Sequence, residues 1–180
     1  MKVKVLLLAV LSVVVVGCAS IPYINVDTLA SPNGKGALAI PTSFELYSQR
    51  SYPCHTISLE LYEQSNSSSI KLNFYPEPDS NYTLFENIEP GSYIIKSMRC
   101  FPPSGQRFRG NLLYLESKGN FEQLIIANKL ALSRRGIYGT EWEDGGFKLQ
   151  FGAKANVTEM LKLVIDDESI NGWDFYVQTD

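Results

Sequence analysis

The sequence predicts a mainly β protein: an antiparallel β-sandwich with one short C-terminal helix, preceded by a signal peptide. Three observations predict this fold class. Apolar and polar residues alternate through several short stretches, which is the period of a strand with one face in water. Turn-forming residues separate these stretches. Near the C-terminus, apolar residues recur at helical spacing behind a capping residue.

The signal peptide is predicted from the beginning of the chain. Lys2 and Lys4 form a short basic region, and residues 5–16 form an apolar run interrupted only by a serine. A small residue, Gly17, then precedes Cys18, which is the layout of a secretory signal that ends at a cleavage site. A transmembrane helix is the alternative, but it needs about 20 apolar residues. This run has twelve.

The pair Gly17-Cys18 resembles the lipobox of bacterial lipoproteins. That resemblance implies that residues 1–17 are removed, that the thiol of Cys18 receives a diacylglycerol, and that the new amino terminus is acylated. Several chains give stable membrane attachment, because a single chain binds reversibly. Ala19 follows, and in enterobacterial-type lipoproteins this implies the outer membrane, with the domain facing the periplasm or the cell surface. The alternative is an ordinary cleaved signal in which Cys18 is a chance residue.

Residues 18–35 predict a tether between the lipid and the folded domain. Pro, Gly, Ser and Asn are dense there and no period is sustained. Residues 21–26 are nevertheless apolar enough for part of them to pack on the domain. We therefore expect a lipoprotein signal peptide at 1–17, a lipidated tether at 18–35, and a β-sandwich domain at 36–180.

The charge balance narrows the range of partners. The formal net charge is -3, and removal of Lys2 and Lys4 leaves 14 of the 16 basic residues against 19 acidic ones. No basic cluster stands out, so we expect no nucleic-acid partner. Electrostatic attraction to anionic lipid is not expected either. The covalent lipid would therefore supply the membrane attachment.

Cys54 and Cys100 are the two cysteines that remain beyond Cys18. Export places them in an oxidising compartment, and two cysteines allow one intramolecular pairing. We therefore predict a Cys54–Cys100 disulfide. The alternatives are a metal or redox pair and two free buried thiols. A metal or redox pair is disfavoured, since the sequence has no CxxC motif and His55 is its sole histidine.

Strand patterns fill the first part of the domain. Residues 37–40 form an apolar run that we expect Pro41 to stop, with 44–47 as a continuation. Residues 55–63 and 70–75 alternate with period two. The polar run between the last two stretches predicts a hairpin.

Residues 82–100 surround Pro90-Gly91, which predicts a type II turn with a positive φ at Gly91. The residues on either side resemble a pattern of prealbumin-like sandwiches, including carboxypeptidase-regulatory and collagen-adhesin B-type repeats. The matching residues are Phe85, Asn87, Ile88, Pro90, Gly91, Tyr93 and Ile95. The resemblance implies a prealbumin- or Ig-like sandwich and says little about activity. A generic turn between two strands would also explain the pattern.

The second part of the domain continues the strand pattern. Residues 111–117 form a candidate strand. Residues 121–132 are apolar without clear alternation, so either a helix or two strands bent at Ala127-Asn128 would fit, and the neighbouring turn residues favour strands. Residues 147–151 alternate cleanly after a turn at 143–146, which predicts a second hairpin.

The predicted helix covers residues 156–164. Asn156 is a candidate N-cap, and Glu159 lies three residues further on, as in a loose capping box. The acidic run at 166–168 ends the helix. Residues 173–179 alternate again and predict a final strand.

No set of residues predicts catalysis, a metal site or a cofactor. Nucleophilic catalysis needs a base beside its nucleophile, and the sole imidazole, His55, adjoins a cysteine that we expect to be oxidised. One histidine and two such cysteines do not supply a zinc site. The acidic run at 166–168 lacks the spacing of a calcium loop, and a solvated turn explains it better.

Aromatic residues indicate a ligand platform instead. Trp142 is flanked by Glu141, Glu143 and Asp144, and aromatic rings beside carboxylates occur together in carbohydrate sites. A plain hairpin tip is the alternative. Tyr138 and Trp173 are further candidates, so the candidate ligand-binding residues are Trp142, Tyr138 and Trp173.

These features together predict a lipid-anchored cell-envelope protein with a non-catalytic binding or scaffolding role, whose partner is another envelope protein. A ligand- or glycan-binding β-sandwich module is the alternative. An envelope hydrolase is the second alternative, and it would need a polar cleft that gathers distant carboxylates.

Overall fold

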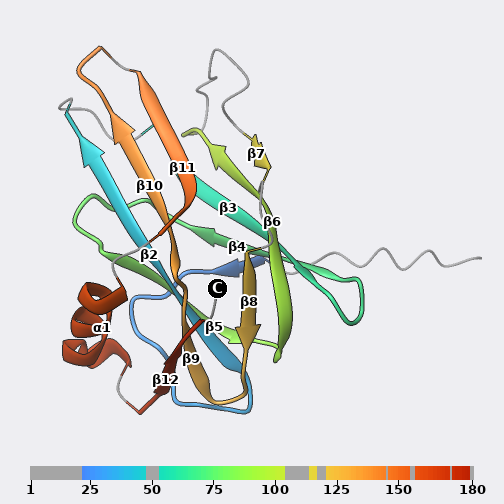
Figure 1. Cartoon of the computed structure of the whole chain (residues 1–180). Helices are drawn as coiled ribbons and strands as arrows, with labels where there is room; N and C mark the ends of the chain where they lie inside the picture. Colours follow the sequence, from blue (N-terminus) through green and yellow to red (C-terminus); the bar gives the residue numbers. More distant parts are fainter. Residues whose placement is uncertain are drawn as a thin grey trace, which may run out of the picture.

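The structure, a computed structural model, describes residues 22–47, 53–103, 114–116, 121–144, 146–154, 157–170 and 172–178. Twelve strands in these residues form two six-stranded sheets, with a helix beside the second (Figure 1). The strands are β1 (Pro22–Ile24), β2 (Gly36–Leu46), β3 (Thr56–Glu63), β4 (Ser69–Phe74), β5 (Tyr82–Ile88), β6 (Gly91–Phe101), β7 (Tyr114–Glu116), β8 (Glu122–Ile125), β9 (Lys129–Leu132), β10 (Arg135–Glu141), β11 (Phe147–Lys154) and β12 (Asp174–Val177). The helix α1 spans Val157–Asp166, and a 3-10 turn follows at Glu168–Ile170.

The mainly β prediction is confirmed, as are most of the predicted elements. The β3–β4 and β10–β11 hairpins form as expected, and α1 and β12 lie where the sequence predicts them. Residues 121–132 form two strands, β8 and β9, with the bend at Asn128, whose φ is 57°. The predicted signal peptide, Cys18 and the proposed cap Asn156 lie outside the described residues.

The first sheet has the order β1-β4-β3-β6. β3 pairs along almost the whole length of β6, and β8 and β7 pair in turn with the other edge of β6. All of these pairs are antiparallel except β1 with β4.

The second sheet is mixed, which corrects the prediction of an antiparallel sandwich. β5 is antiparallel to β2, whereas β9 and then β10 run parallel to β2. β11 is antiparallel to β10, and β12 is parallel to β9. The parallel pairs arise because the chain passes through the first sheet between β2 and β9, and such long connections allow parallel pairing. Alternation of side chains reports burial and carries no information on strand direction.

Pro41 lies inside β2 and does not end it, so the expected stop is wrong. Proline removes one donor from a ladder and is tolerated in a strand where the pairing is interrupted. β9 pairs with β2 as far as Ala39, and β10 pairs with it from Thr42 onward. Ser133 and Arg134 lie between these two partner strands. The regular parallel ladder is therefore interrupted beside Pro41.

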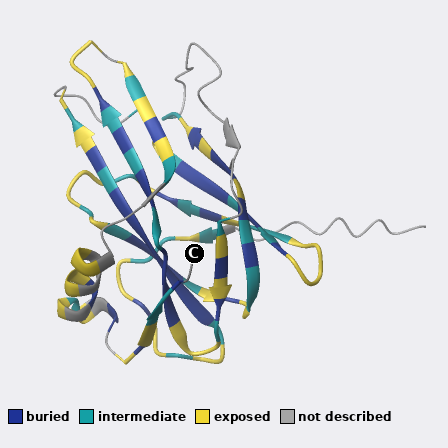
Figure 2. Cartoon of the chain, viewed as in Figure 1, coloured by how far each residue is buried: buried dark blue, intermediate teal, exposed yellow. Residues whose placement is uncertain are grey.

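The two sheets share one hydrophobic core, which makes the fold a β-sandwich (Figure 2). Phe74 of the first sheet lies between Phe44 and Phe85 of the second, with ring centroids 6.2 Å and 6.3 Å apart. Aromatic rings attract at such separations. The other large side chains that are fully buried are Leu38, Ile40, Ile57, Leu59, Leu61, Leu72, Ile88, Ile95, Met98 and Ile125.

A smaller cluster lies on the outer face of the second sheet, next to α1. Ala37 and Ala39 of β2 are fully buried there against residues such as Val164 of α1 and Trp173. Their neighbour Leu38 points to the opposite face, into the main core. β2 is therefore buried on both faces, with small side chains on the α1 side.

The described part of the predicted tether, residues 22–35, contacts both sheets, and the packing that the sequence predicts for part of residues 21–26 is present. β1 pairs with β4, and Val26 forms an isolated bridge with Leu84 of β5. Leu29 is buried in the outer cluster. The physical reason is that this apolar segment covers an edge of the first sheet that would otherwise be open.

The turn at Pro90-Gly91 links the two sheets, and Gly91 has no positive φ, so the type II turn is wrong. Asn87 adopts the left-handed conformation instead, with φ 60°. A side chain at position 91 would be crowded for another reason: a Cβ there would lie 3.2 Å from the Glu63 carboxylate, which would have to move by a few tenths of an ångström. This turn joins β5, in the second sheet, to β6, in the first, and is thus a tight crossing between the sheets.

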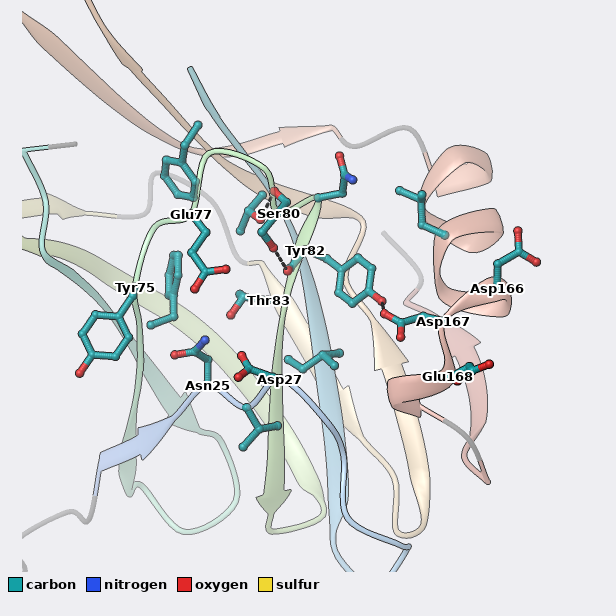
Figure 3. Close-up of a pocket in the computed structure, with 17 residues that line it drawn as sticks. Asn25, Asp27, Tyr75, Glu77, Ser80, Tyr82, Thr83, Asp166, Asp167 and Glu168 are labelled. Carbon is teal, nitrogen blue, oxygen red and sulfur yellow. Dashed lines mark hydrogen bonds between the residues drawn. The ribbon is translucent and has the colours of Figure 1, made fainter. Parts of the chain in front are cut away.

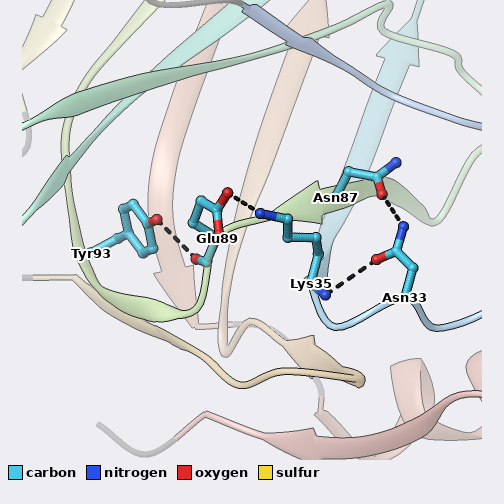
Figure 4. Close-up of polar contacts among 5 residues, drawn as sticks. All are labelled: Asn33, Lys35, Asn87, Glu89 and Tyr93. Carbon is cyan, nitrogen blue, oxygen red and sulfur yellow. Dashed lines mark hydrogen bonds and ion pairs between the residues drawn. The ribbon is translucent and has the colours of Figure 1, made fainter.

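A polar network fastens this crossing to the chain before β2 (Figure 4). Lys35 forms an ion pair with Glu89, and the Asn33 side-chain amide donates to Asn87 Oδ1 at 2.7 Å. The Tyr93 hydroxyl donates to the Glu89 carbonyl at 2.9 Å. Burial, together with the nearby Glu63 and Glu89 carboxylates, raises the pKa of Tyr93 to about 12.

The predicted disulfide between Cys54 and Cys100 is present, with the two Cα atoms 5.3 Å apart. Cys54 precedes β3 and Cys100 lies near the end of β6, so the bond joins neighbouring strands of the first sheet. Both side chains are buried. The thiol alternatives, a metal pair and two free cysteines, are thereby excluded for this structure.

Loss of the disulfide should destabilise the sandwich. Replacing both cysteines, Cys54→Ala with Cys100→Ala, is expected to lower the free energy of unfolding by about 2–4 kcal/mol, because the unfolded chain gains conformational freedom. Urea unfolding followed by circular dichroism measures the change. Wild-type protein in reductant serves as the control and should approach the double variant. An unfolding midpoint that reductant leaves unchanged would contradict the prediction.

Tyr93 should ionise late in an alkaline titration. In an unfolded chain tyrosine ionises near pH 10, whereas Tyr93 in the folded protein has a pKa of about 12. The folded state favours the neutral phenol, so the contribution to stability is complete below about pH 10 and is lost as the pH rises through about 12. Near-ultraviolet absorbance should show a late component that Tyr93→Phe reduces. The same titration in denaturant is the control and should lack that component.

Candidate functional site

His55 and the adjacent Cys54 do not form a base–nucleophile pair. Cys54 is oxidised to a disulfide and therefore cannot act as a nucleophile. The His55 ring lies against the ring of Tyr75, with centroids 5.4 Å apart.

The three predicted platform residues do not form a common surface. Trp142 lies at the tip of the β10–β11 hairpin and is 44% exposed. The half-buried Tyr138 ring lies over Gly136, where a Cβ would come within 2.9 Å of its hydroxyl. Trp173 is 8% exposed, and its indole N–H donates to the Ala30 carbonyl at 2.7 Å. Of the three, Trp142 alone presents an open ring.

Trp142 is instead accompanied by Tyr47, which the sequence analysis did not single out. β2 and β10 run parallel and end together, and the Tyr47 N–H donates to the Glu141 carbonyl at 3.0 Å. Tyr47 is 57% exposed. Both aromatic residues line a hollow of about 600 Å³, here called the tip hollow. Its lining residues are Glu45, Tyr47, Thr140, Trp142, Glu143 and Asp144.

Local hydrogen bonds hold the tip hollow in shape. The Tyr47 hydroxyl donates to Glu45 Oε2 at 3.1 Å, and the Glu45 carboxylate raises the pKa of Tyr47 through this bond and its charge. The backbone N–H of Trp142 donates to the Gly146 carbonyl at 2.8 Å, and the backbone N–H of Gly146 donates to Asp144 Oδ1 at 2.9 Å. The tip therefore combines exposed aromatic surface with fixed carboxylate acceptors.

A second hollow of about 570 Å³ lies between α1 and the start of β5 (Figure 3). Residues 25–27, the β4–β5 connection and the end of α1 form its walls. We call it the acidic groove, because five carboxylate residues line it. They are Asp27, Glu77, Asp166, Asp167 and Glu168.

Hydrogen bonds position the walls of the acidic groove. The Tyr82 hydroxyl donates to Asp167 Oδ2, which joins β5 to the residue after α1. The Thr42 hydroxyl donates to the Ser80 carbonyl at 3.1 Å, and the Ser80 hydroxyl donates to the Tyr82 carbonyl at 2.6 Å. The groove is thus built from four separate parts of the chain: residues 25–27, β2, the β4–β5 region and the end of α1.

The acidic groove is not apparent in the sequence, because its acidic residues are distant from one another along the chain. Asp27 belongs to the predicted tether, and the sequence of the run at 166–168 predicts a solvated turn. Neither stretch has the spacing of a known site. Only the docking of residues 22–35 and the position of α1 bring them together.

Two further observations concern the described residues alone. They contain no group of three or more His, Cys, Asp or Glu side chains placed to hold a metal ion. No helix among them is long and apolar enough to cross a membrane. Comparison of the chain with models of protein families, with curated proteins and with solved structures finds no match.

Proposed function

We propose that the protein is a lipid-anchored cell-envelope protein with a non-catalytic binding role, and that its sandwich binds a glycan at the tip hollow. The observation that carries the binding role is the pair of exposed aromatic rings, Tyr47 and Trp142, beside carboxylates. Exposed apolar surface rimmed by polar groups is typical of an interaction site. The anchor rests on Cys18 and the signal peptide before it.

A sugar suits the tip hollow because it has two kinds of surface. Its ring carbons offer an apolar face that packs on an aromatic ring, and its hydroxyl groups donate hydrogen bonds around the edge. Ionised carboxylates act only as acceptors, and Glu45, Glu143 and Asp144 supply them beside the rings. The tip also lies well away from β1, where the described chain begins (Figure 1).

We also propose the prealbumin-like relationship for the segment around Pro90-Gly91. It is supported by the position of the motif, which joins the two sheets of the sandwich. The parallel pairs of β9 and β10 with β2 depart from an Ig-like antiparallel arrangement.

The anchor can be tested with Cys18→Ser. Without the thiol no diacylglycerol is attached, so the variant should leave the membrane fraction and remain folded with its disulfide intact. Fractionation in the native host, with mass analysis of the released chain, measures this. Cys54→Ala is the control, since it removes a different cysteine and should stay in the membrane. A Cys18→Ser variant that also stays there contradicts the proposed anchor.

The glycan role can be tested with Trp142→Ala. The chain has two tryptophans, and Trp173 is buried, so a glycan that covers Trp142 should shift the emission of that residue to the blue. Against a panel of bacterial cell-wall and outer-membrane glycans, loss of the ring should weaken binding roughly tenfold, as for a central aromatic contact.

The matched control is Phe175→Ala, which removes a ring that is 40% exposed on β12, outside the tip hollow. Its glycan affinity should equal that of the wild type. Equal losses in both variants, or a panel in which no glycan binds, would count against a glycan ligand and favour a protein partner. Release of shortened glycan during incubation would indicate the hydrolase alternative.

A further inference from the structure

We propose that the acidic groove is a second binding site, and that it takes a linear aliphatic polyamine. The groove shares no lining residue with the tip hollow. The inference therefore stands independently of a glycan ligand.

The charge of the groove requires a cation. Its described lining residues include five carboxylates and no lysine, arginine or histidine. Asp27, Glu77, Asp166 and Glu168 are exposed at its surface, and none of these four forms a salt bridge within the described part of the chain. Carboxylates gathered around one hollow attract positive charge, since the hollow concentrates their field.

Buried oxygens inside the groove indicate that the cation donates hydrogen bonds. Thr83 is only 7% exposed, and its Oγ1 has no hydrogen-bond partner. Asn25 Oδ1, which lines the same groove, is also buried without a partner. Buried polar atoms in folded proteins are nearly always paired. In Figure 3, Thr83 lies at the centre, with Glu77 on one side and Asn25 and Asp27 on the other.

An alkylammonium group matches this set of acceptors. It carries three donors on one nitrogen, whereas guanidinium presents its donors in a flat fork. The two buried acceptors, the Thr83 hydroxyl and the Asn25 amide oxygen, come from different elements. They suit donors that diverge from one nitrogen better than the flat fork of a guanidinium. Metal binding is disfavoured, because the described residues offer no group of three such ligands.

The groove has a second anionic end, at the end of α1. Asp166, Asp167 and Glu168 lie there, apart from the end formed around Thr83 (Figure 3). Tyr82 lies between the two ends (Figure 3), and the groove lining also includes apolar residues such as Leu163. Methylene chains pack on such surface while their charged ends remain at polar groups. A ligand with ammonium groups at both ends of a methylene chain fits this layout.

The test is calorimetric titration of the full chain, solubilised in detergent, with spermidine. Primary diamines of increasing length and a monoamine of the same chain length complete the series. We expect spermidine and the longer diamines to bind more tightly than the monoamine, because only they reach both anionic ends. Raising the salt concentration should weaken the binding, since exposed charges are screened.

Two variants place the ligand in the groove. Glu77→Gln should weaken spermidine binding about tenfold, because the amide oxygen still accepts a hydrogen bond but no longer carries the charge that strengthens it. Thr83→Val should weaken it as well, yet leave the ligand-free protein equally or more stable to heat, since it removes an unpaired buried hydroxyl. The matched control is Asp79→Asn, an exposed carboxylate in the same β4–β5 connection that does not line the groove. It should bind spermidine like the wild type.

Other outcomes overturn the proposal. Equal affinity for the monoamine and the longer diamines would remove the role of the second end. Displacement of spermidine by equimolar Ca²⁺ would show a metal site, and tighter binding of a lysine-rich peptide would show a docking site for a basic polypeptide. Wild-type affinity in both Glu77→Gln and Thr83→Val would place the polyamine elsewhere. Trp142→Ala should leave spermidine binding unchanged, which separates this site from the tip hollow.

Discussion

The structure depends on the burial of β2 on both faces. Large side chains such as Leu38 and Ile40 fill the space between the sheets, whereas Ala37 and Ala39 leave room for the cluster beneath α1. Residues 36–42 of this strand are buried, and its edges pair with β5 on one side and with β9 followed by β10 on the other. The main core, the outer cluster and the mixed sheet all follow from this one central strand.

Both candidate sites lie where elements end. The tip hollow forms where β2 and β10 stop together, and the acidic groove forms where α1 ends beside the start of β5. Strand interiors use their backbone groups in ladders, so they supply rigidity. The ends supply side chains that remain available for ligands, and their hydrogen bonds to neighbouring turns keep those side chains in place.

The local elements were predictable because each has its own pattern. Alternation identified β3, β4 and β11, and capping with helical spacing identified α1. Strand direction and the course of β2 through Pro41 were not predictable, since each depends on a partner that is distant in sequence. The apolar character of residues 21–26 predicted that part of them packs, but not which strands they contact. The same limit applies to the sites. Trp142 could be singled out from the sequence because carboxylates flank it. Tyr47 and Thr83 could not, because the residues that make each of them part of a site are brought close only by the fold.

The described chain is docked on the sandwich from Pro22 onward, and this matters for the proposed anchor. If Cys18 carries the lipid, only residues 18–21 separate the bilayer from β1, and four residues reach at most about 14 Å. The sandwich would then ride close to the headgroups with restricted rotation. So short a linker would restrict the orientation of the domain relative to the membrane. The anchor would then orient the sandwich as well as attach it.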